Sequence, residues 1–206
     1  MSRRRLAVVS SGLRQPSSTR LLADRLTDST VRTLGEQGVD VDVEVIELRD
    51  HAHDLTNNLL TGFPSPSLRA AIDSVVLADG LIAVSPIFTA SYSGLFKMFF
   101  DVLDADALTG KPVLIGATGG TERHSLALEH ALRPMFAYLR SVVVPTGVYA
   151  ATSDWGEEGE NTAVGLTRRI DRAARELATL IGAGAYTGPA DPFGDPTPFE
   201  QLLVGD

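Results

Sequence analysis

Short, continuous apolar runs are the most regular feature of the chain. Residues 80–84 (GLIAV) carry no polar side chain, a pattern typical of a strand in a parallel sheet that is covered on both faces. Residues 4–10 end in a similar run, whereas residues 39–48 alternate apolar and acidic positions, which indicates a strand near a sheet edge. We predict five strands, at residues 4–10, 39–48, 80–84, 112–117 and 141–144.

Segments with apolar residues at helical spacing lie between and after these runs. Ser17 or Ser18 can cap the first helix, and Gly35 or Gly38 can end it. Pro134 lies inside a helical pattern, where it predicts a kink or a bulge. We predict helices at residues 18–35, 68–78, 94–103, 124–139 and 161–181, and loops at residues 49–67, 85–93, 118–123 and 146–160.

The alternation of strands and helices predicts an α/β fold. Its core is a doubly wound, five-stranded parallel sheet with strand order 2-1-3-4-5 and helices on both faces. The 206 residues suffice for one domain, which we place at residues 1–181. Residues 182–206 are rich in Gly, Pro and Asp and predict an irregular tail. This tail could pack on a partner subunit through Phe193, Phe199 and residues 202–204.

Composition and charge narrow the classes of function. The net charge of −8 argues against nucleic acid as a partner. The absence of cysteine excludes disulfides, thiol catalysis and Cys-ligated metal centres. His51 and His53 are close in sequence, but we interpret them as surface-loop residues and expect no metal. No apolar stretch approaches the roughly 20 residues of a membrane span, so we expect a cytoplasmic protein that does not bind membranes.

The first predicted strand is followed by a loop rich in hydroxyl groups. Ligands of doubly wound sheets bind outside the carboxyl ends of the strands. The loop lacks the glycines of a dinucleotide fingerprint and the lysine of a P-loop. Backbone N–H groups at the start of the next helix, together with Ser11, Ser17, Ser18, Thr19 and the charge of Arg14, fit a monophosphate. The alternative is simple capping of the helix by one serine.

The loop after the strand at 80–84 suits a planar ring. Pro86 stiffens the turn and removes a donor, which leaves the backbone of residues 87–89 and the Phe88 side chain to face a heterocycle. The alternative is an ordinary loop with Phe88 and Tyr92 in the core. After the strand at 112–117, Gly119 and Gly120 allow close approach to a ligand, or they form only a glycine turn.

Three motifs in these loops resemble those of a known family. They are S-G-L-R-x-x-S-S-T at 11–19, S-P-I-F-x-x-S-Y-S-G-L-F-K at 85–97 and A-T-G-G-T-x-x-H-S-L-x-x-x-x-x-L-R-P at 117–134. In order and spacing the chain resembles the NAD(P)H-dependent FMN reductases of the flavodoxin-like superfamily, over about residues 6–171. The branch that partners flavin-dependent monooxygenases is the most similar. Phe88 stands where many members carry Tyr, so only a packing role is expected for it.

The resemblance implies an FMN site and a reaction. Hydride from NADPH or NADH reduces FMN, and the reduced flavin is supplied to a monooxygenase. No protein acid–base catalyst is expected, because the chemistry belongs to the flavin. The FMN contacts implied are Ser11, Leu13, Arg14, Ser17, Ser18, Thr19, Pro86, Ile87, Phe88, Thr89, Thr118, Gly119, Gly120 and Thr121.

The resemblance also implies a homodimer or homotetramer, with the flavin near the subunit interface. Met135, Phe136 and Tyr138 are candidates for that contact, and ordinary core packing is the alternative. A phosphate of the nicotinamide donor could be met by Arg14, Arg20 or Arg123, among which the sequence does not choose. Three other functions remain open: a quinone or azo-type reductase with bound FMN, a flavodoxin-type electron carrier, and a binding protein that has lost the flavin.

Overall fold

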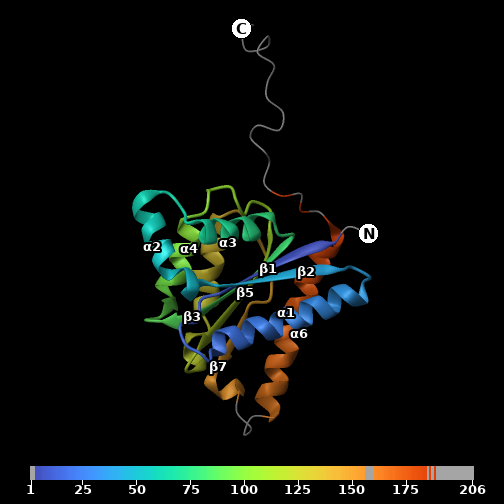
Figure 1. Cartoon of the computed structure of the whole chain (residues 1–206). Coiled ribbons are helices and arrows are strands. Elements are labelled where there is room, and N and C mark those ends of the chain that lie inside the picture. The colour runs from blue at the N-terminus through green and yellow to red at the C-terminus, as the bar shows by residue number, and fades with distance from the viewer. Residues whose placement is uncertain (1–2, 156–159, 185, 187, 189–206) are drawn as a thin grey trace, which may run out of the picture.

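A twisted parallel sheet forms the centre of the computed structural model, which describes residues 3–155, 160–184, 186 and 188 (Figure 1). The sheet order is β2-β1-β3-β5-β6, with β7 also paired to β5 and the short β4 antiparallel to β3. The predicted order 2-1-3-4-5 is therefore confirmed for the five main strands. The strands are β1 (Arg4–Ser10), β2 (Val41–Glu47), β3 (Gly80–Phe88), β4 (Ser91–Tyr92), β5 (Pro112–Gly119), β6 (Val142–Val143) and β7 (Val148–Ala151).

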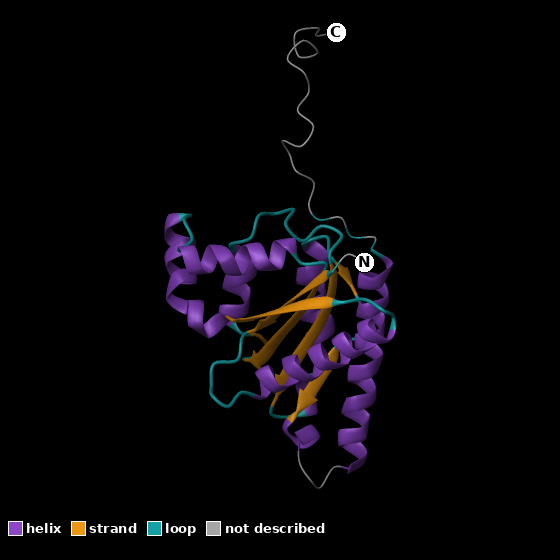
Figure 2. Cartoon of the chain, turned by 45° about the vertical axis from the view of Figure 1, so that its right-hand side comes forward, coloured by secondary structure: helices purple, strands orange, loops and turns teal. Residues whose placement is uncertain are grey.

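Helices cover both faces of the sheet, as predicted (Figure 2). On one face, α1 (Ser18–Glu36) and α6 (Glu160–Ala183) pack together over the strands. The other face is covered by α2 (Ala52–Thr61), α3 (Pro66–Leu77), α4 (Gly94–Asp101) and α5 (Arg133–Tyr138). Each face has its own apolar core, because the side chains of a strand alternate between the two sides.

Parallel pairing brings the carboxyl ends of four strands to one edge of the sheet. Ser10 pairs with Val84, and Pro86 pairs with Thr118, which in turn pairs with Ala150. The loops after β1, β3, β5 and β7 therefore start side by side, although they come from distant parts of the chain.

The predicted loops at 85–93 and 146–160 contain short strands, so the sheet has more than the five strands predicted. Residues 146–160 include β7 and the 3₁₀ helix η4 (Thr152–Trp155), and residues 85–93 form the tight β3–β4 hairpin. At the turn of that hairpin, Thr89 and Ala90 have positive φ angles of 49° and 67°. Short strands of this kind are stabilised by pairing to a neighbour and leave little local pattern.

The region at 49–67 was wrongly predicted as a loop. It forms the 3₁₀ helix η1 (Leu48–His51) and then α2. Leu55 is fully buried, and Gly62 ends the helix in a left-handed conformation with φ 78°. Ser65 caps the start of α3 through a hydrogen bond from the Leu68 N–H, 3.2 Å away, with Pro66 as the first helical residue. Gly62 and Pro66 thus mark the boundary between two helices.

The predicted helix at 124–139 is also broken. It consists of the 3₁₀ helix η2 (Glu122–His124), the π-helix η3 (Leu128–Leu132) and α5. Pro134 lies in the first turn of α5, directly after the π-helical turn, so the predicted bulge is present. Phe136 is fully buried against Phe96 and Phe100, which corrects its proposed place at a subunit contact.

The predicted domain boundary at residue 181 falls inside α6, which continues to Ala183. Phe193, Phe199 and residues 202–204 of the predicted tail lie outside the described residues. Within the described part of the chain, no helix has the length and apolar character needed to cross a membrane.

Candidate functional site

A cleft of about 650 Å³ opens at the carboxyl ends of β1, β3, β5 and β7. This volume lies within the range of small-molecule sites, roughly 300–1,000 Å³. The three loops that the sequence singled out therefore line one cavity, together with residues of the predicted loop 146–160. Its walls are formed by Gly12, Leu13, Arg14, Pro16, Ser17, Ser18, Thr19, Pro86, Phe88, Gly119, Thr152 and Trp155.

One end of the cleft is the start of α1. Ser17 is the N-cap residue, and its Oγ accepts a hydrogen bond from the Arg20 N–H at 3.3 Å. Capping of the helix is therefore real, but the first N–H groups of a helix have no intrahelical acceptor and one serine cannot satisfy them all. No acidic residue lies in the first turn. The part of the cleft at the start of α1 is thus electropositive and suited to an anion.

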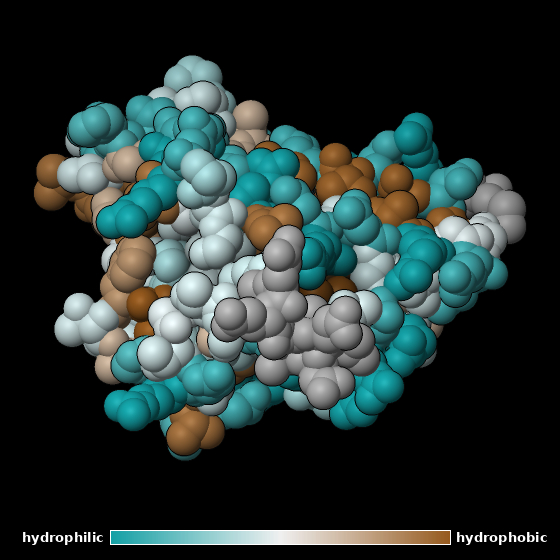
Figure 3. Space-filling model, turned by 90° about the horizontal axis from the view of Figure 1, so that it is seen from below, coloured by the Kyte–Doolittle hydropathy of each residue, from teal (hydrophilic) through white to brown (hydrophobic). Residues whose placement is uncertain are grey.

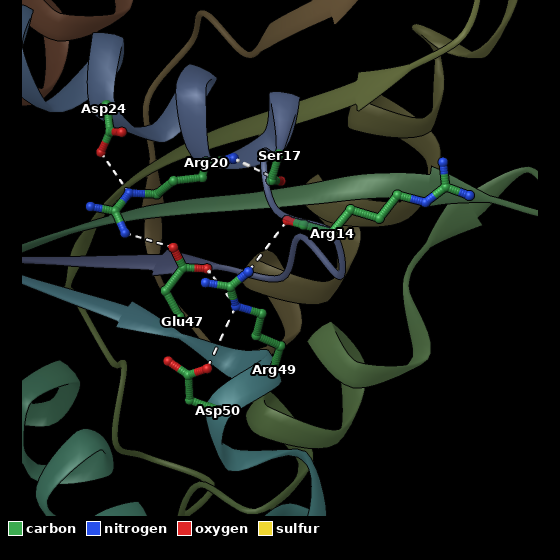
Figure 4. Close-up of polar contacts among 7 residues, drawn as sticks. All are labelled: Arg14, Ser17, Arg20, Asp24, Glu47, Arg49 and Asp50. Carbon is green, nitrogen blue, oxygen red and sulfur yellow. Dashed lines mark hydrogen bonds and ion pairs between the residues drawn. The ribbon is translucent and has the colours of Figure 1, made fainter.

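The loop before α1 is folded tightly against this cap. A Cβ atom at Gly12 would lie only 2.1 Å from Ser17 Oγ, so the position accepts no side chain in this conformation. Ser18 is exposed to the cleft. The Arg14 guanidinium has no hydrogen-bonding or ion-pair partner among the described residues and extends freely, as Figure 4 shows. Both side chains are available to a bound anion.

Two predicted phosphate-binding hydroxyls are used inside the protein. Ser11 is fully buried; its Oγ donates to the Val84 carbonyl at 3.4 Å and accepts from Ser93 Oγ at 3.1 Å. Thr19 Oγ1 and Thr118 Oγ1 are 2.8 Å apart and share one hydrogen bond. Ser11 and Thr118 do not line the cleft. Their side chains instead join the loops after β1, β3 and β5.

Part of the cleft wall is apolar. Pro86 is buried, whereas the Phe88 side chain is 48% exposed and lies on the cleft rather than in the core. Ile87 is half-buried and pairs with Tyr92 in the β3–β4 hairpin, and Thr89 lies at its turn. Ile87 and Thr89 do not line the cleft in this structure.

The glycine loop after β5 is held in place by Tyr149, a residue of β7. Tyr149 Oη donates to the Thr121 carbonyl at 2.7 Å, and burial raises the pKa of this hydroxyl. A Cβ atom at Gly119 would lie 2.1 Å from the same Oη. Gly119 therefore permits the contact that fixes the loop, while Gly120 and Thr121 are exposed beyond the cleft wall.

Thr152 and Trp155 are cleft residues that the sequence did not suggest. Both belong to η4, which follows the strand that was missed. Asp154 fixes this turn by accepting from the Ala151 N–H at 2.7 Å and from Arg169 Nη2 at 3.1 Å. The Arg25 guanidinium lies 4.9 Å from the centre of the Trp155 ring. A strand at 148–151, ending at the same sheet edge as the others, is the signal that would have pointed to them.

A charged network lies behind the start of α1 (Figure 4). Arg20 donates to Asp24 at 2.7 Å and to Glu47 at 2.6 Å, and these hydrogen bonds raise the pKa of its guanidinium. Arg20 is thus already paired, which leaves Arg14 as the cleft arginine open to a ligand. Arg123 and His124 line a separate, shallow cavity of about 410 Å³ beside the cleft.

The end of the molecule where η4 and the start of α6 lie is seen face-on in Figure 3. Most of its visible surface is hydrophilic, with hydrophobic residues in separate small groups. Among the described residues, no three His, Cys, Asp or Glu side chains come together as a metal site requires. The residues that line the cleft can thus hold an anion at the start of α1 and a planar, partly apolar group against Pro86 and Phe88.

Comparison with known proteins gives a consistent result. The sequence profile described as "NADPH-dependent FMN reductase" matches residues 4–156. An "FMN reductase (NADPH)" of Pseudomonas aeruginosa is 39% identical over 178 residues, which cover 86% of this chain and 92% of that protein. The "NADH-dependent FMN reductase SfnF" of Pseudomonas fluorescens is 37% identical over 180 residues, with the same two coverages. The solved structure of an oxidoreductase from Corynebacterium diphtheriae is 47% identical, covers 89% of this chain and 99% of its own, and superposes with a TM-score of 0.85.

Proposed function

The chain belongs to the family of NADPH-dependent FMN reductases, and we propose that its cleft binds FMN and a nicotinamide donor side by side. The observation that carries the proposal is that one cleft is lined by two kinds of residue. The start of α1 presents helix N–H groups and a free arginine, and the loop after β3 presents Pro86 and Phe88. A flavin mononucleotide has two matching parts, a phosphate and a planar ring.

The residues at the start of α1 hold the phosphate in this proposal. The N–H groups of Ser18 and Thr19 and the Ser18 hydroxyl donate to its oxygens, and Arg14 supplies the opposite charge. Gly12 and the Ser17 cap keep the loop compact enough for these donors to converge. Ser11 and Thr118 contribute by fixing the neighbouring loops rather than by direct side-chain contact.

The loops after β3 and β5 hold the ring. Pro86 and Phe88 supply an apolar wall for it, and Gly119, which lines the same cleft, leaves room for the backbone to approach the ring. When bound, FMN accepts hydride from the nicotinamide ring of NADPH or NADH, which is the chemistry that the family name implies. The protein need only hold the two rings in contact and leave one ring face open to the donor.

The reaction class follows from family membership, and the use of its product is a proposal. The motifs at 11–19, 85–97 and 117–134 resemble those of reductases that partner flavin-dependent monooxygenases. We therefore propose that reduced FMN is supplied to such a monooxygenase. A homodimer or homotetramer is proposed with it, because Tyr138 and Leu126 are large side chains that are 86% and 63% exposed.

The test is a visible spectrum of the purified protein after addition of FMN and removal of the excess. NADPH and NADH are then added anaerobically in separate cuvettes. Retained flavin that is bleached rapidly by either donor supports the proposal and identifies the donor. Bound flavin that neither donor bleaches would point to an electron carrier. Failure to bind FMN would show that the cleft has been assigned the wrong ligand.

A further inference from the structure

We propose that Arg49, which lies outside the cleft, is a positioning residue that sets the phosphate-binding loop of residues 12–17 in its binding conformation. The inference rests on the proposed FMN site and goes beyond it, because it assigns a role to a residue that no ligand touches. Arg49 belongs to η1, directly after β2, and is not among the residues that line the cleft.

Arg49 contacts two consecutive residues of the loop from behind. Its Nη1 donates to the Arg14 carbonyl at 3.3 Å. The Gln15 side-chain amide satisfies its neighbours when its oxygen faces the Arg49 guanidinium. In this orientation the Gln15 oxygen accepts hydrogen bonds from Arg49 Nη1, at 3.0 Å, and from Arg49 Nη2. A planar guanidinium can make these contacts together because its donors form a rigid fork. Arg49 therefore hydrogen-bonds to the loop at one backbone oxygen, of Arg14, and one side-chain oxygen, of Gln15.

The guanidinium of Arg49 is itself held by two carboxylates. Its Nε lies 3.5 Å from Asp50 Oδ1 and 3.8 Å from Glu47 Oε2. The Glu47 side chain is only 12% exposed, and its other oxygen accepts from Arg20 Nη1 at 2.6 Å. Glu47 Oε2 is buried without a hydrogen bond, so its ion pair with Arg49 offsets part of the free-energy cost of burying this carboxylate. Glu47 thus links the first turn of α1 to the end of β2 and, through Arg49, to the loop between β1 and α1.

The contact sets the direction of the one free arginine among the described residues that line the cleft. Figure 4 shows the Arg14 carbonyl facing Arg49 while the Arg14 side chain extends the opposite way. Fixing this carbonyl fixes the orientation of the residue, and so the path by which the Arg14 guanidinium leaves the loop. Without Arg49, the exposed loop residues 13–16 would sample other orientations, and phosphate binding would have to offset the entropy lost in ordering them.

A competing explanation is that Arg49 acts only as a positive charge near the phosphate. The two roles separate on substitution by lysine, which keeps the charge but cannot reach two acceptors with a rigid fork. R49K and R49Q should therefore behave alike if Arg49 positions the loop. R49K should behave like the wild type if only its charge matters.

The experiment measures the dissociation constants of FMN and of riboflavin, which lacks the phosphate, for the wild type, R49Q and R49K. R32Q is the matched control, because Arg32 forms an ion pair with Asp171 away from the cleft. We expect both Arg49 variants to bind FMN about tenfold more weakly, as for loss of one charge-assisted hydrogen bond. Riboflavin affinity should stay within about twofold of the wild-type value, and R32Q should match the wild type for both ligands.

Two results would overturn the inference. One is wild-type FMN affinity in R49K. The other is an equal loss of FMN and riboflavin affinity in both variants with a lowered melting temperature, which would mean that Arg49 merely supports the fold. If the wild-type protein itself did not prefer FMN to riboflavin, the proposed phosphate site would be wrong, and the inference would fall with it. If the wild type does prefer FMN, an unexpected result in the Arg49 variants counts against the role of Arg49 alone and leaves the phosphate site standing.

Discussion

Replacement of Gly119 by alanine should break the contact that holds the glycine loop beside the cleft. The new Cβ would lie 2.1 Å from Tyr149 Oη and 3.2 Å from its Cζ. Tyr149 is buried, and its hydroxyl donates to the Thr121 carbonyl at 2.7 Å. The ring therefore cannot move away from the methyl group without giving up this hydrogen bond and disturbing its neighbours.

The magnitude follows from these two effects. Loss of the hydrogen bond costs about 0.5–1.5 kcal/mol, and forcing a methyl group into a filled space costs about 1–3 kcal/mol. We expect G119A to lower the free energy of unfolding by about 2–4 kcal/mol. Y149F alone should cost about 1 kcal/mol, because the exposed Thr121 carbonyl can bond to water instead.

The two substitutions should be strongly non-additive. In a Y149F background the hydroxyl is gone, and the nearest atom to the new Cβ is Cζ at 3.2 Å, a contact relieved by a small shift. Gly119 has no positive φ angle, so alanine there restricts the unfolded chain without straining the strand. G119A should then cost less than about 1 kcal/mol, which gives a coupling energy of about 1–3 kcal/mol.

Urea unfolding of the wild type, both single variants and the double variant measures this cycle, provided that the m-value stays constant. FMN affinity of the same four proteins reports whether the loop position matters for the ligand. Equal destabilisation by G119A in both backgrounds would refute the reasoning, because the cost would then not come from the Tyr149 hydroxyl.

Three further predictions concern single side chains. R14Q should weaken FMN binding about tenfold and leave riboflavin binding unchanged, as measured by flavin fluorescence; an equal loss for both ligands would place Arg14 away from the phosphate. T118V should lower the free energy of unfolding by about 1–3 kcal/mol, because it leaves the buried Thr19 hydroxyl without its partner, and an unchanged urea midpoint would contradict this. Burial lowers the pKa of Lys111 to about 7. The unfolded chain therefore binds a proton that the folded protein does not hold, and the wild type should gain up to about 1.4 kcal/mol per pH unit between pH 7 and 10 relative to K111M. If the free energies of unfolding of the wild type and K111M change with pH in parallel, Lys111 does not cause the pH dependence.

The main features of the fold could be predicted because they depend on the local pattern of apolar and polar residues. The apolar runs of β1, β3 and β5 alternate with amphipathic helices, and this alternation fixes a doubly wound sheet. The elements that the sequence analysis missed depend on contacts between residues that are far apart in the chain. β7 is four residues long and exists because it pairs with β5. The helix α2 is stabilised by burial of Leu55 despite two asparagines and nearby breakers.

In the candidate site, too, the sequence gives the residue types but not their partners. The four hydroxyls at Ser11, Ser17, Ser18 and Thr19 look equivalent in sequence, but their partners are different. Ser17 caps a helix, Thr19 pairs with a residue 99 positions away, Ser11 is buried beside Ser93, and Ser18 faces the cleft. No pattern along the chain reports such partners, since they are set by which loops the sheet brings together.

The sequence singled out Arg14 for the phosphate, but it gave no sign of what Arg20 and Arg49 bind. Arg20 is paired twice, Arg49 grips the loop from outside, and Arg14 extends freely. The acidic partners that decide these roles include Glu47 at the end of β2, 27 positions from Arg20. The charge of an arginine does not show which of these contacts it makes.

The measurement that tests the proposed FMN site most directly is a crystal structure of the protein with FMN. We predict the phosphate within hydrogen-bonding distance of the Ser18 and Thr19 N–H groups and of Arg14, with the ring between Phe88 and the backbone at Gly119. A flavin bound elsewhere on the protein, or one bound in the cleft with its phosphate away from the start of α1, would contradict this assignment.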